Sequence, residues 1–215
     1  MLSSHKKLNL KNSDKFSNVV AGMLWNLSDL HRIANRTTDA LQAIGKALEI
    51  YKKLESTNSA ENLNSMADTL NQRSILYRDE NRMTEALQDD KKALNILKKL
   101  EFNNPEFFST KVAKKLYNLA YRYRVENRMP EARQAYDEAL NSYRELERKN
   151  PGVYRPDVAM ILNNLGNLHR NENRMPDARQ AYEESLKIFR GLAEVSPAIY
   201  NSYLRKVQLN FDDLH

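Results

Sequence analysis

Arginine recurs along this chain at one fixed interval, and amide side chains keep the same interval. The arginines stand 46 residues apart, at Arg32, Arg78, Arg124 and Arg170. The amides stand at Asn26, Gln72, Asn118 and Asn164. A guanidinium group binds carboxylates and phosphates, whereas a primary amide presents a donor and an acceptor together, as a peptide backbone does. The chemistry open to these residues is therefore noncovalent recognition of an anionic or extended ligand.

Aromatic and further polar residues accompany these two series. One column holds Trp25, Asn71, Tyr117 and Asn163, and another holds Asp29, Ile75, Tyr121 and Asn167. On a helix, offsets of four and seven residues place such columns on one face. We predict a ligand-binding surface made of Trp25, Asn26, Asp29, Arg32, Asn71, Gln72, Arg78, Tyr117, Asn118, Tyr121, Arg124, Asn163, Asn164, Asn167 and Arg170.

Each series also has a structural interpretation, which the sequence leaves open. Amides cap neighbouring helices or are solvated, arginines bridge nearby acids such as Asp79 or Glu126, and aromatic side chains pack. A second arginine series lies in the expected turns and is predicted to be structural. Its members are Arg36, Arg82, Arg128 and Arg174.

Residues suited to covalent or metal chemistry are scarce. The sequence has no Cys and 4 His, and it contains no Gly-rich phosphate loop. His31 and His169 share a column with Tyr77 and Tyr123, which favours aromatic packing over metal ligation. We therefore predict no enzymatic activity, no cofactor and no metal site.

The composition favours a helical protein. Only 5 Gly and 6 Pro occur among 215 residues, and the abundant residue types are helix formers. The sequence has no apolar run as long as a membrane span, and its start lacks the apolar core of a signal peptide. The net charge of +6 is compatible with acidic partners. We expect a cytoplasmic protein that does not associate with membranes.

The 46-residue interval marks a repeated pair of helices. The dipeptide Asn-Arg begins at Asn35, Asn81, Asn127 and Asn173. Apolar residues keep helical spacing on both sides of it, and Asn is the non-Gly residue best suited to a left-handed helix end. Pro130 and Pro176 suit the first turn of the helix that follows. We therefore predict a turn at each Asn-Arg between two antiparallel helices.

Leucine, a small residue and an aromatic residue recur in a recognisable order within the repeats. The last repeat has Leu162-x2-Leu165-Gly166-x2-His169, then Ala178-x3-Tyr182. This pattern resembles the tetratricopeptide repeat signature, in the long-repeat form of kinesin light chains. The resemblance implies an all-α fold, a right-handed superhelical solenoid of antiparallel helix pairs. Small residues are expected to face one another where the two helices approach closely.

The phase of the repeats sets the predicted boundaries. We expect a flexible segment over residues 1–13 and a repeat region over 14–197, with repeats at about 14–58, 59–104, 105–150 and 151–197. A solitary capping helix over 198–215 should follow, because Asp212 occupies a slot that is small in the repeats.

The second repeat departs from the signature at two positions. Arg73 replaces a leucine and Asp90 replaces the aromatic residue. A lone buried charge is costly, so we predict that these two residues pair across the two helices.

The resemblance also implies a function. First helices of this family line a concave groove, so we expect a scaffold that binds a protein or peptide segment, with some acidic character, in that groove. The alternative is a nucleic-acid-binding helical repeat that uses the arginine columns and stacking aromatics. Acids near the arginines and the lack of a recurring base-reading pattern disfavour nucleic acid. A receptor for chaperone tails is also disfavoured, because Trp25 stands where such clamps carry a lysine.

Overall fold

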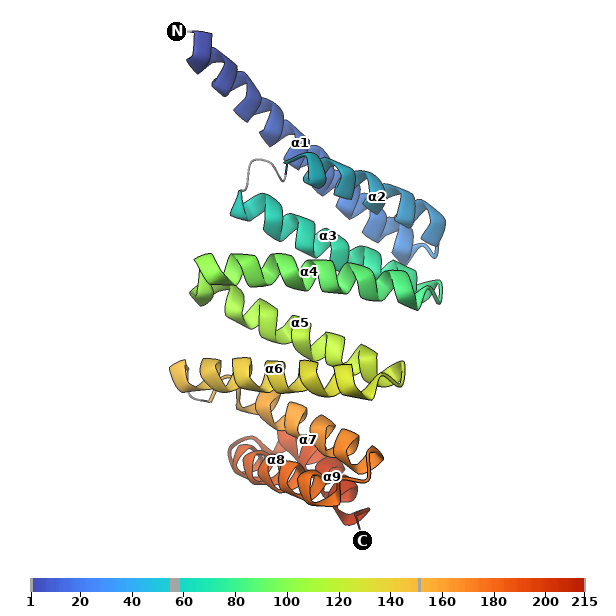
Figure 1. The fold of residues 1–215 in the computed structure, drawn as a ribbon, viewed down its shortest axis with the longest axis vertical. Helices are drawn as coiled ribbons and strands as arrows, with labels where there is room; N and C mark the ends of the chain where they lie inside the picture. The colour runs from blue at the N-terminus through green and yellow to red at the C-terminus, as the bar shows by residue number, and fades with distance from the viewer. Residues whose placement is uncertain (1, 55–58, 151, 215) are drawn as a thin grey trace. The chain divides into compact units, whose positions relative to one another are not determined.

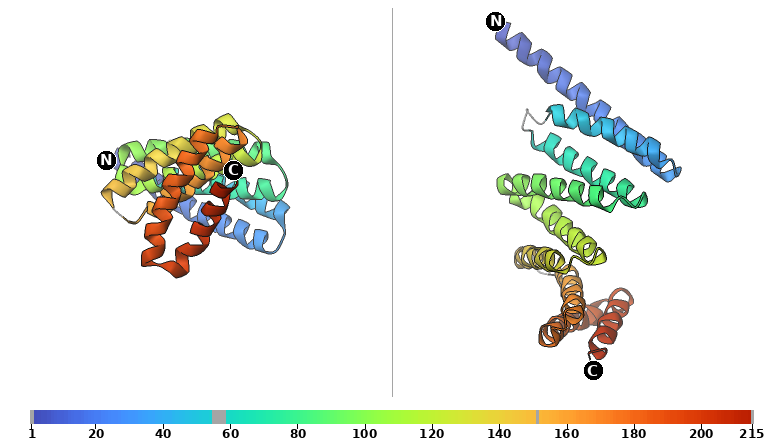
Figure 2. Two further views of the ribbon diagram at one scale, coloured as in Figure 1. Left: turned by 90° about the horizontal axis from the view of Figure 1, so that it is seen from below. Right: turned by 45° about the vertical axis from the view of Figure 1, so that its right-hand side comes forward.

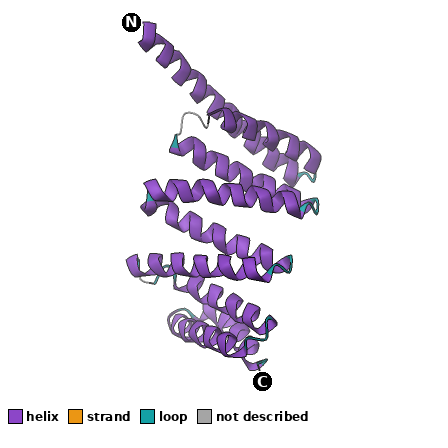
Figure 3. Ribbon diagram, viewed as in Figure 1, coloured by secondary structure: helices purple, strands orange, loops and turns teal. Residues whose placement is uncertain are grey.

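The structure is a computed structural model that describes residues 2–54, 59–150 and 152–214, with side chains from residue 14 onward. Regular structure in these ranges is entirely helical (Figures 1 and 3). The helices are α1 (Leu2–Ile33), α2 (Thr37–Leu54), α3 (Ala60–Asp79), α4 (Met83–Asn103), α5 (Pro105–Val125), α6 (Met129–Lys149), α7 (Arg155–Asn171), α8 (Met175–Val195) and α9 (Pro197–Asp212). The all-α prediction is confirmed.

The helices form two compact units, which are described separately. The first unit covers Met1–Phe108 and the second covers Ser109–His215. In the first unit α1 packs on α2, α2 on α3 and α3 on α4; in the second, α6 packs on α7, α7 on α8 and α8 on α9 (Figures 1 and 2). Among the described helices, none combines the length and the apolar character needed to cross a membrane.

Each Asn-Arg dipeptide forms the turn of a helix pair, as predicted. Asn35, Asn81, Asn127 and Asn173 have positive φ angles of 57°, 58°, 58° and 59°. In the second repeat the Asn81 N–H donates to the Arg78 carbonyl at 2.9 Å, and the Arg82 N–H donates to the Tyr77 carbonyl at 2.7 Å. These are the two hydrogen bonds of a Schellman helix end, so the left-handed Asn satisfies carbonyls that would otherwise lack partners.

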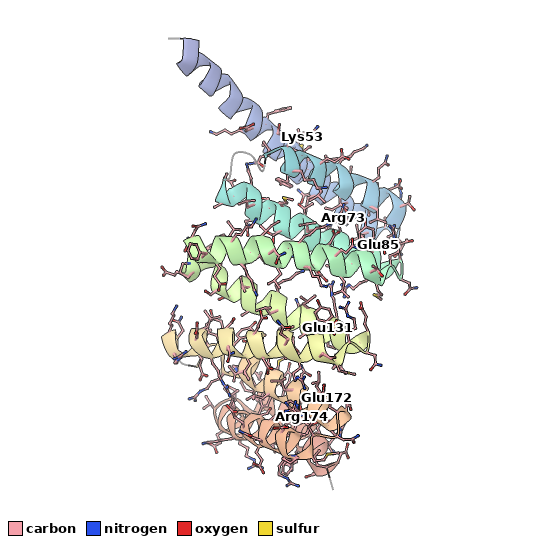
Figure 4. The ribbon with its side chains drawn as sticks, viewed as in Figure 1. Lys53, Arg73, Glu85, Glu131, Glu172 and Arg174 are labelled. Atoms are coloured by element: carbon pink, nitrogen blue, oxygen red, sulfur yellow. The ribbon has the colours of Figure 1, made fainter. Side chains whose placement is uncertain are left out.

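The arginine of each dipeptide starts the next helix. Its carbonyl accepts a hydrogen bond from the N–H four residues later, as the Arg82 carbonyl does from the Ala86 N–H. Its guanidinium pairs with an acid three residues later. The pairs are Arg36–Asp39 (2.7 Å), Arg82–Glu85 (2.8 Å), Arg128–Glu131 (2.9 Å) and Arg174–Asp177 (2.8 Å). Glu85 and Glu131 lie at the starts of α4 and α6 (Figure 4). The prediction that this arginine series lies in the turns is confirmed; its structural role stays a prediction.

The predicted boundaries can be compared with the helix ends. Residues 2–13, expected to be a flexible segment, form the first part of α1, and no Gly or Pro interrupts them. The expectation about their motion stays a prediction. Three first helices begin close to the expected starts, α3 at Ala60, α5 at Pro105 and α9 at Pro197. However, α7 begins later, at Arg155, after Gly152 with a φ of 92°.

Small residues allow close helix packing, and what they face differs between repeats. In the first repeat the Ser28 hydroxyl donates to the Ala40 carbonyl at 2.9 Å, which brings two small residues together. In the last repeat a Cβ atom added to Gly166 would lie 2.6 Å from Cε1 of Tyr182. Gly166 therefore makes room for a buried aromatic ring, a contact that the expectation of small facing small did not include.

The predicted pairing of Arg73 with Asp90 is also wrong. Arg73 instead donates from Nε and Nη2 to the two carboxylate oxygens of Asp89, at 2.6 and 2.8 Å. Asp89 is 2% exposed, and the bidentate geometry supplies the charge compensation that such burial requires. Asp90 is buried beside it, in the column of the aromatic residue. Figure 4 shows Arg73 on α3 beside α4.

The left-handed turn yields a first prediction. Replacing Asn127 with Val should lower the free energy of unfolding by about 1–2 kcal/mol or more, because a β-branched side chain clashes at positive φ. Replacing Asn127 with Gly should cost far less. Asn150→Val is the control, since Asn150 directly follows α6 as its C-cap residue with a negative φ of −133°. Equal urea midpoints for the two Val variants would contradict this account.

The Arg73–Asp89 pair yields a second prediction. Arg73→Leu restores the signature leucine yet should destabilise the chain by about 3–5 kcal/mol, because it leaves Asp89 buried without its main partner. Adding Asp89→Leu should recover most of that loss in a double-mutant cycle. As a control, Arg144→Leu removes an ion pair whose partner Glu184 is 41% exposed, and should cost about 0–1 kcal/mol. Additive effects at Arg73 and Asp89 would show that the pair is not coupled.

Candidate functional site

Six of the predicted site residues come together in the second unit. They line an open pocket of about 420 Å³ between α5, α7 and α9. We call this pocket the basic cleft, and its lining is Tyr117, Tyr121, Arg124, Asn164, Asn167, Arg170, Asn171, Lys206 and Asn210. Three helices that are far apart in sequence therefore present one polar surface.

Helical spacing explains how each element contributes. On α5, Tyr117, Tyr121 and Arg124 are separated by four and three residues, so they share one face. On α7 the spacing from Asn164 to Asn167 and on to Arg170 is three residues each time, and Lys206 and Asn210 stand four apart on α9. The first helices of successive repeats thus supply matching faces, as the column pattern predicts.

Two amides of the cleft, Asn164 and Asn167, are each held at one end by a tyrosine. The Asn164 Nδ2 donates to the Tyr117 hydroxyl at 3.1 Å. The Tyr182 hydroxyl donates to Oδ1 of Asn167 at 2.9 Å, from a ring that is fully buried. These bonds fix the orientation of both amides, so Oδ1 of Asn164 and Nδ2 of Asn167 are the ends that remain to meet a ligand.

The cleft carries three cations. Arg124 lies over the Tyr121 ring, with its guanidinium carbon 5.0 Å from the ring centre, and Arg170 approaches the exposed Asp213 at 3.4 Å. Among the residues that the structure describes, no carboxylate lines the cleft, and Arg124 and Lys206 form no ion pair. The local field is therefore positive and favours an anionic ligand.

Burial keeps the tyrosine hydroxyls of this region protonated. The pKa of Tyr117 is raised, mainly by burial, although its hydrogen bond with Asn164 opposes the rise. Burial also raises the pKa of Tyr136 and of Tyr182, against the opposing charges of Arg124 and Arg170 respectively. These phenols remain neutral hydrogen-bonding groups at physiological pH, which suits binding rather than proton transfer.

A smaller apolar recess adjoins the basic cleft and shares Tyr117, Asn164 and Lys206 with it. Its volume is about 80 Å³, and its other lining residues are Met160, Asn163, Phe189, Tyr203 and Val207. Asn163 is buried and accepts a hydrogen bond from Nδ2 of Asn210 at 2.9 Å, which ties α7 to α9. Asn163 therefore supports the site instead of lining the cleft itself.

The remaining predicted residues of the second and first units are not gathered in this way. Asn118 is exposed on α5 and does not line the cleft, and Asn26 is likewise exposed on α1. Asp29 pairs with Arg32 at 2.9 Å, so each neutralises the other. Trp25 is half-buried and packs against the cluster of Ala40, Ile44 and Leu76.

The other first-unit residues have unequal environments. Gln72 is buried, whereas Asn71 and Arg78 are half-buried on the same helix. The described pocket of this unit, about 490 Å³ beside Leu63 and Phe102, contains none of the predicted residues. A ligand-binding role for the first-unit residues stays a prediction.

Three cleft residues were missed by the sequence prediction: Asn171, Lys206 and Asn210. A signal for two of them exists, because α9 keeps the phase of the first helices. The amide column of Asn118 and Asn164 continues at the same 46-residue step to Asn210, and Lys206 repeats Lys114 two steps later. Helix α9, predicted only to cap the repeats, also lines the cleft.

Comparisons with known proteins agree with this architecture. A family model described as tetratricopeptide repeat matches residues 111–191, and a second of the same description matches 66–101, together more than half of the chain. No curated protein matches the sequence.

Two crystal structures show the likeness of fold. BtubC (BKLC) from P. vanneervenii has a TM-score of 0.58 and 20% identity, covering 95% of this chain and 82% of that one. A Podosopora anserina structure described as kinesin light chain nearly identical TPR-like repeats has a TM-score of 0.57 and 12% identity, covering 92% and 94%. The predicted helical-repeat solenoid of kinesin-light-chain-like form is confirmed.

The packing beneath the cleft yields a third prediction. Gly166→Ala should destabilise the chain by about 1–3 kcal/mol, because the added methyl group collides with the Tyr182 ring that holds Asn167. Gly191→Ala is the matched control, since a Cβ there meets nothing within 4 Å and lies inside α8. It should stabilise by about 0.5–1 kcal/mol. Thermal unfolding with equal shifts of the same sign for both variants would contradict the packing argument.

Proposed function

The chain belongs to the tetratricopeptide repeat family, whose repeats form protein–protein interaction scaffolds, and from this premise we propose that it holds an acidic peptide segment of a partner protein in the basic cleft. In this proposal the chain is a non-enzymatic scaffold located in the cytoplasm. The observation that carries the proposal is the placement of Arg124, Arg170 and Lys206 around one open pocket with no carboxylate among its described lining residues.

The roles of the cleft residues follow from their contacts. Arg124 and Lys206 attract carboxylates of the peptide, and Arg124 is held in place by the Tyr121 ring. The free ends of Asn164 and Asn167 engage the peptide backbone, with about 0.5–1.5 kcal/mol from each hydrogen bond. After the cost of ordering the peptide, we expect affinities near micromolar, about −8 kcal/mol.

Nucleic acid is the competing ligand, because phosphates are attracted by the same three cations and bases stack on tyrosines such as Tyr121. The two classes differ in how binding responds to salt. Neutralising several phosphates releases condensed counterions and gives a steep salt dependence, whereas a peptide held partly by amides responds less. The dependence of affinity on salt concentration therefore separates them.

The cleft yields a fourth prediction. Lys206→Glu should weaken binding of a labelled Glu-rich peptide at least about tenfold, which corresponds to 1.4 kcal/mol, because it places a like charge at the cleft. Arg205→Glu is the matched control: its residue is the next one along α9, is also exposed, and does not line the cleft. Both variants change the net charge equally and should keep the thermal midpoint of the wild type.

The outcomes are read by fluorescence anisotropy at two salt concentrations. Equal losses for Lys206→Glu and Arg205→Glu would show that the whole charge of the chain, and not the cleft, attracts the peptide. Tighter binding of a single-stranded oligonucleotide than of the peptide, with a steep salt slope that flattens in Lys206→Glu, would replace the proposed peptide ligand by nucleic acid.

A further inference from the structure

Helix α1 exposes a row of large apolar side chains. We call Phe16, Val19, Met23, Leu27 and Leu30 the α1 stripe; their exposed fractions lie between 42 and 71%. The spacings along the stripe are three, four, four and three residues, so all five side chains fall within about 80° of arc on the helix. A contiguous exposed apolar surface of this kind marks an interaction site.

The opposite face of α1 already has a packing partner. Ala21 and Ser28 are fully buried, and Ser28 bonds to the Ala40 carbonyl of α2. Trp25 packs on the cluster that contains Ile44. The stripe is therefore a second apolar face on a helix whose first face is in use, and a helix that is apolar on both sides is normally covered on both.

The inner repeats show what fits such a face. One 46-residue step from Leu30 is Leu76 on α3, which is fully buried against Ala40 and Ile44 of α2. The equivalents of Met23 and Leu30 on α7 are Ile161 and Leu168, which are also fully buried. The same surface that α1 exposes is thus shaped to receive an α-helix.

The stripe is symmetric about its central residue. Phe16 and Leu30 each stand seven residues from Met23, and Val19 and Leu27 each stand four. Two copies of such a stripe are complementary when the helices run antiparallel, because every contact is then repeated by the two-fold axis. We propose that the α1 stripe is a homodimer interface, in which α1 packs antiparallel against α1 of a second copy with Met23 at the axis.

In this dimer Phe16 meets Leu30 of the other copy, and Val19 meets Leu27. The stripe belongs to the first unit and the basic cleft to the second, and they share no residue, so the proposal is independent of what the cleft binds. Gly22 adds no side chain beside the axis, and a Cβ there would meet nothing within 4 Å in its own chain. In Figure 1, α1 is the outermost helix of its unit.

Light scattering after size exclusion tests the association. The wild-type chain, of 25.0 kDa, should have a mass of about 50 kDa that falls on dilution. Met23→Glu should reduce it to that of the monomer, because the axis would place two carboxylates together. Val195→Glu is the control: Val195 is 84% exposed at the end of α8, outside the stripe, and its variant should remain dimeric. Circular dichroism should show both variants folded.

Disulfide trapping tests the antiparallel register, and the absence of Cys from the sequence makes single substitutions clean. Met23→Cys should form a covalent dimer on oxidation. Phe16→Cys alone and Leu30→Cys alone should not, because in an antiparallel pair the two copies of either residue lie about 21 Å apart, far beyond disulfide reach. A mixture of the Phe16→Cys and Leu30→Cys chains should form a mixed covalent dimer.

Two results would overturn the proposal. A wild-type mass of 25.0 kDa at every concentration would exclude self-association and leave the stripe to a helix of another protein. Efficient trapping of Phe16→Cys with itself, without the mixed dimer, would show a parallel pair and reject the two-fold axis at Met23. Dimerisation that survives Met23→Glu would place the interface elsewhere on the chain.

Discussion

The left-handed turn at each Asn-Arg dipeptide is the constraint on which the helix pairs depend. Only three residues link the paired helices, for example Glu80 to Arg82 between α3 and α4. The Asn closes the first helix through its positive φ, and the Arg carbonyl opens the second. So short a link forces the two helices to run antiparallel and in close contact, which in turn requires small residues such as Ser28 and Gly166 at the contact.

The left-handed turn could be predicted from local backbone preferences, whereas the ion-pair partner of Arg73 could not. The positive φ of Asn127 depends only on its own conformational preference and on the neighbouring helix ends, both of which are visible in the sequence. The partner of Arg73 depends on which carboxylate the guanidinium group reaches at the end of its long side chain. Column equivalence aligned Asp90 with the buried aromatic residues, but the guanidinium reaches the neighbouring Asp89. Repeats fix backbone positions, and they do not fix which of two adjacent side chains an arginine meets.

The same distinction explains the site. Four arginines hold equivalent places, yet the residue three positions earlier decides what each can do. In the first repeat that residue is Asp29, which neutralises Arg32 at 2.9 Å. In the third it is Tyr121, whose ring supports Arg124 and leaves its charge uncompensated among the described residues. About half of the predicted surface therefore lies on the cleft or beside it. The residue three positions before each arginine, which is visible in the sequence, explains why, among the described residues, Arg124 keeps a free charge and Arg32 does not.

Helices α1 and α9 carry different residue types on the faces that the inner repeats bury. In α9, Asp212 occupies the column that is small in the repeats, and its carboxylate is exposed and accepts a hydrogen bond from Nε2 of Gln208 at 2.8 Å. A charged group at this slot suits a helix face that meets water. In α1, the face that later repeats bury keeps large apolar residues, such as Met23 and Leu30, where water would favour polar ones. Because Ile161 and Leu168, the α7 equivalents of Met23 and Leu30, are fully buried in the repeat packing, we assign a covering helix to the α1 stripe as well.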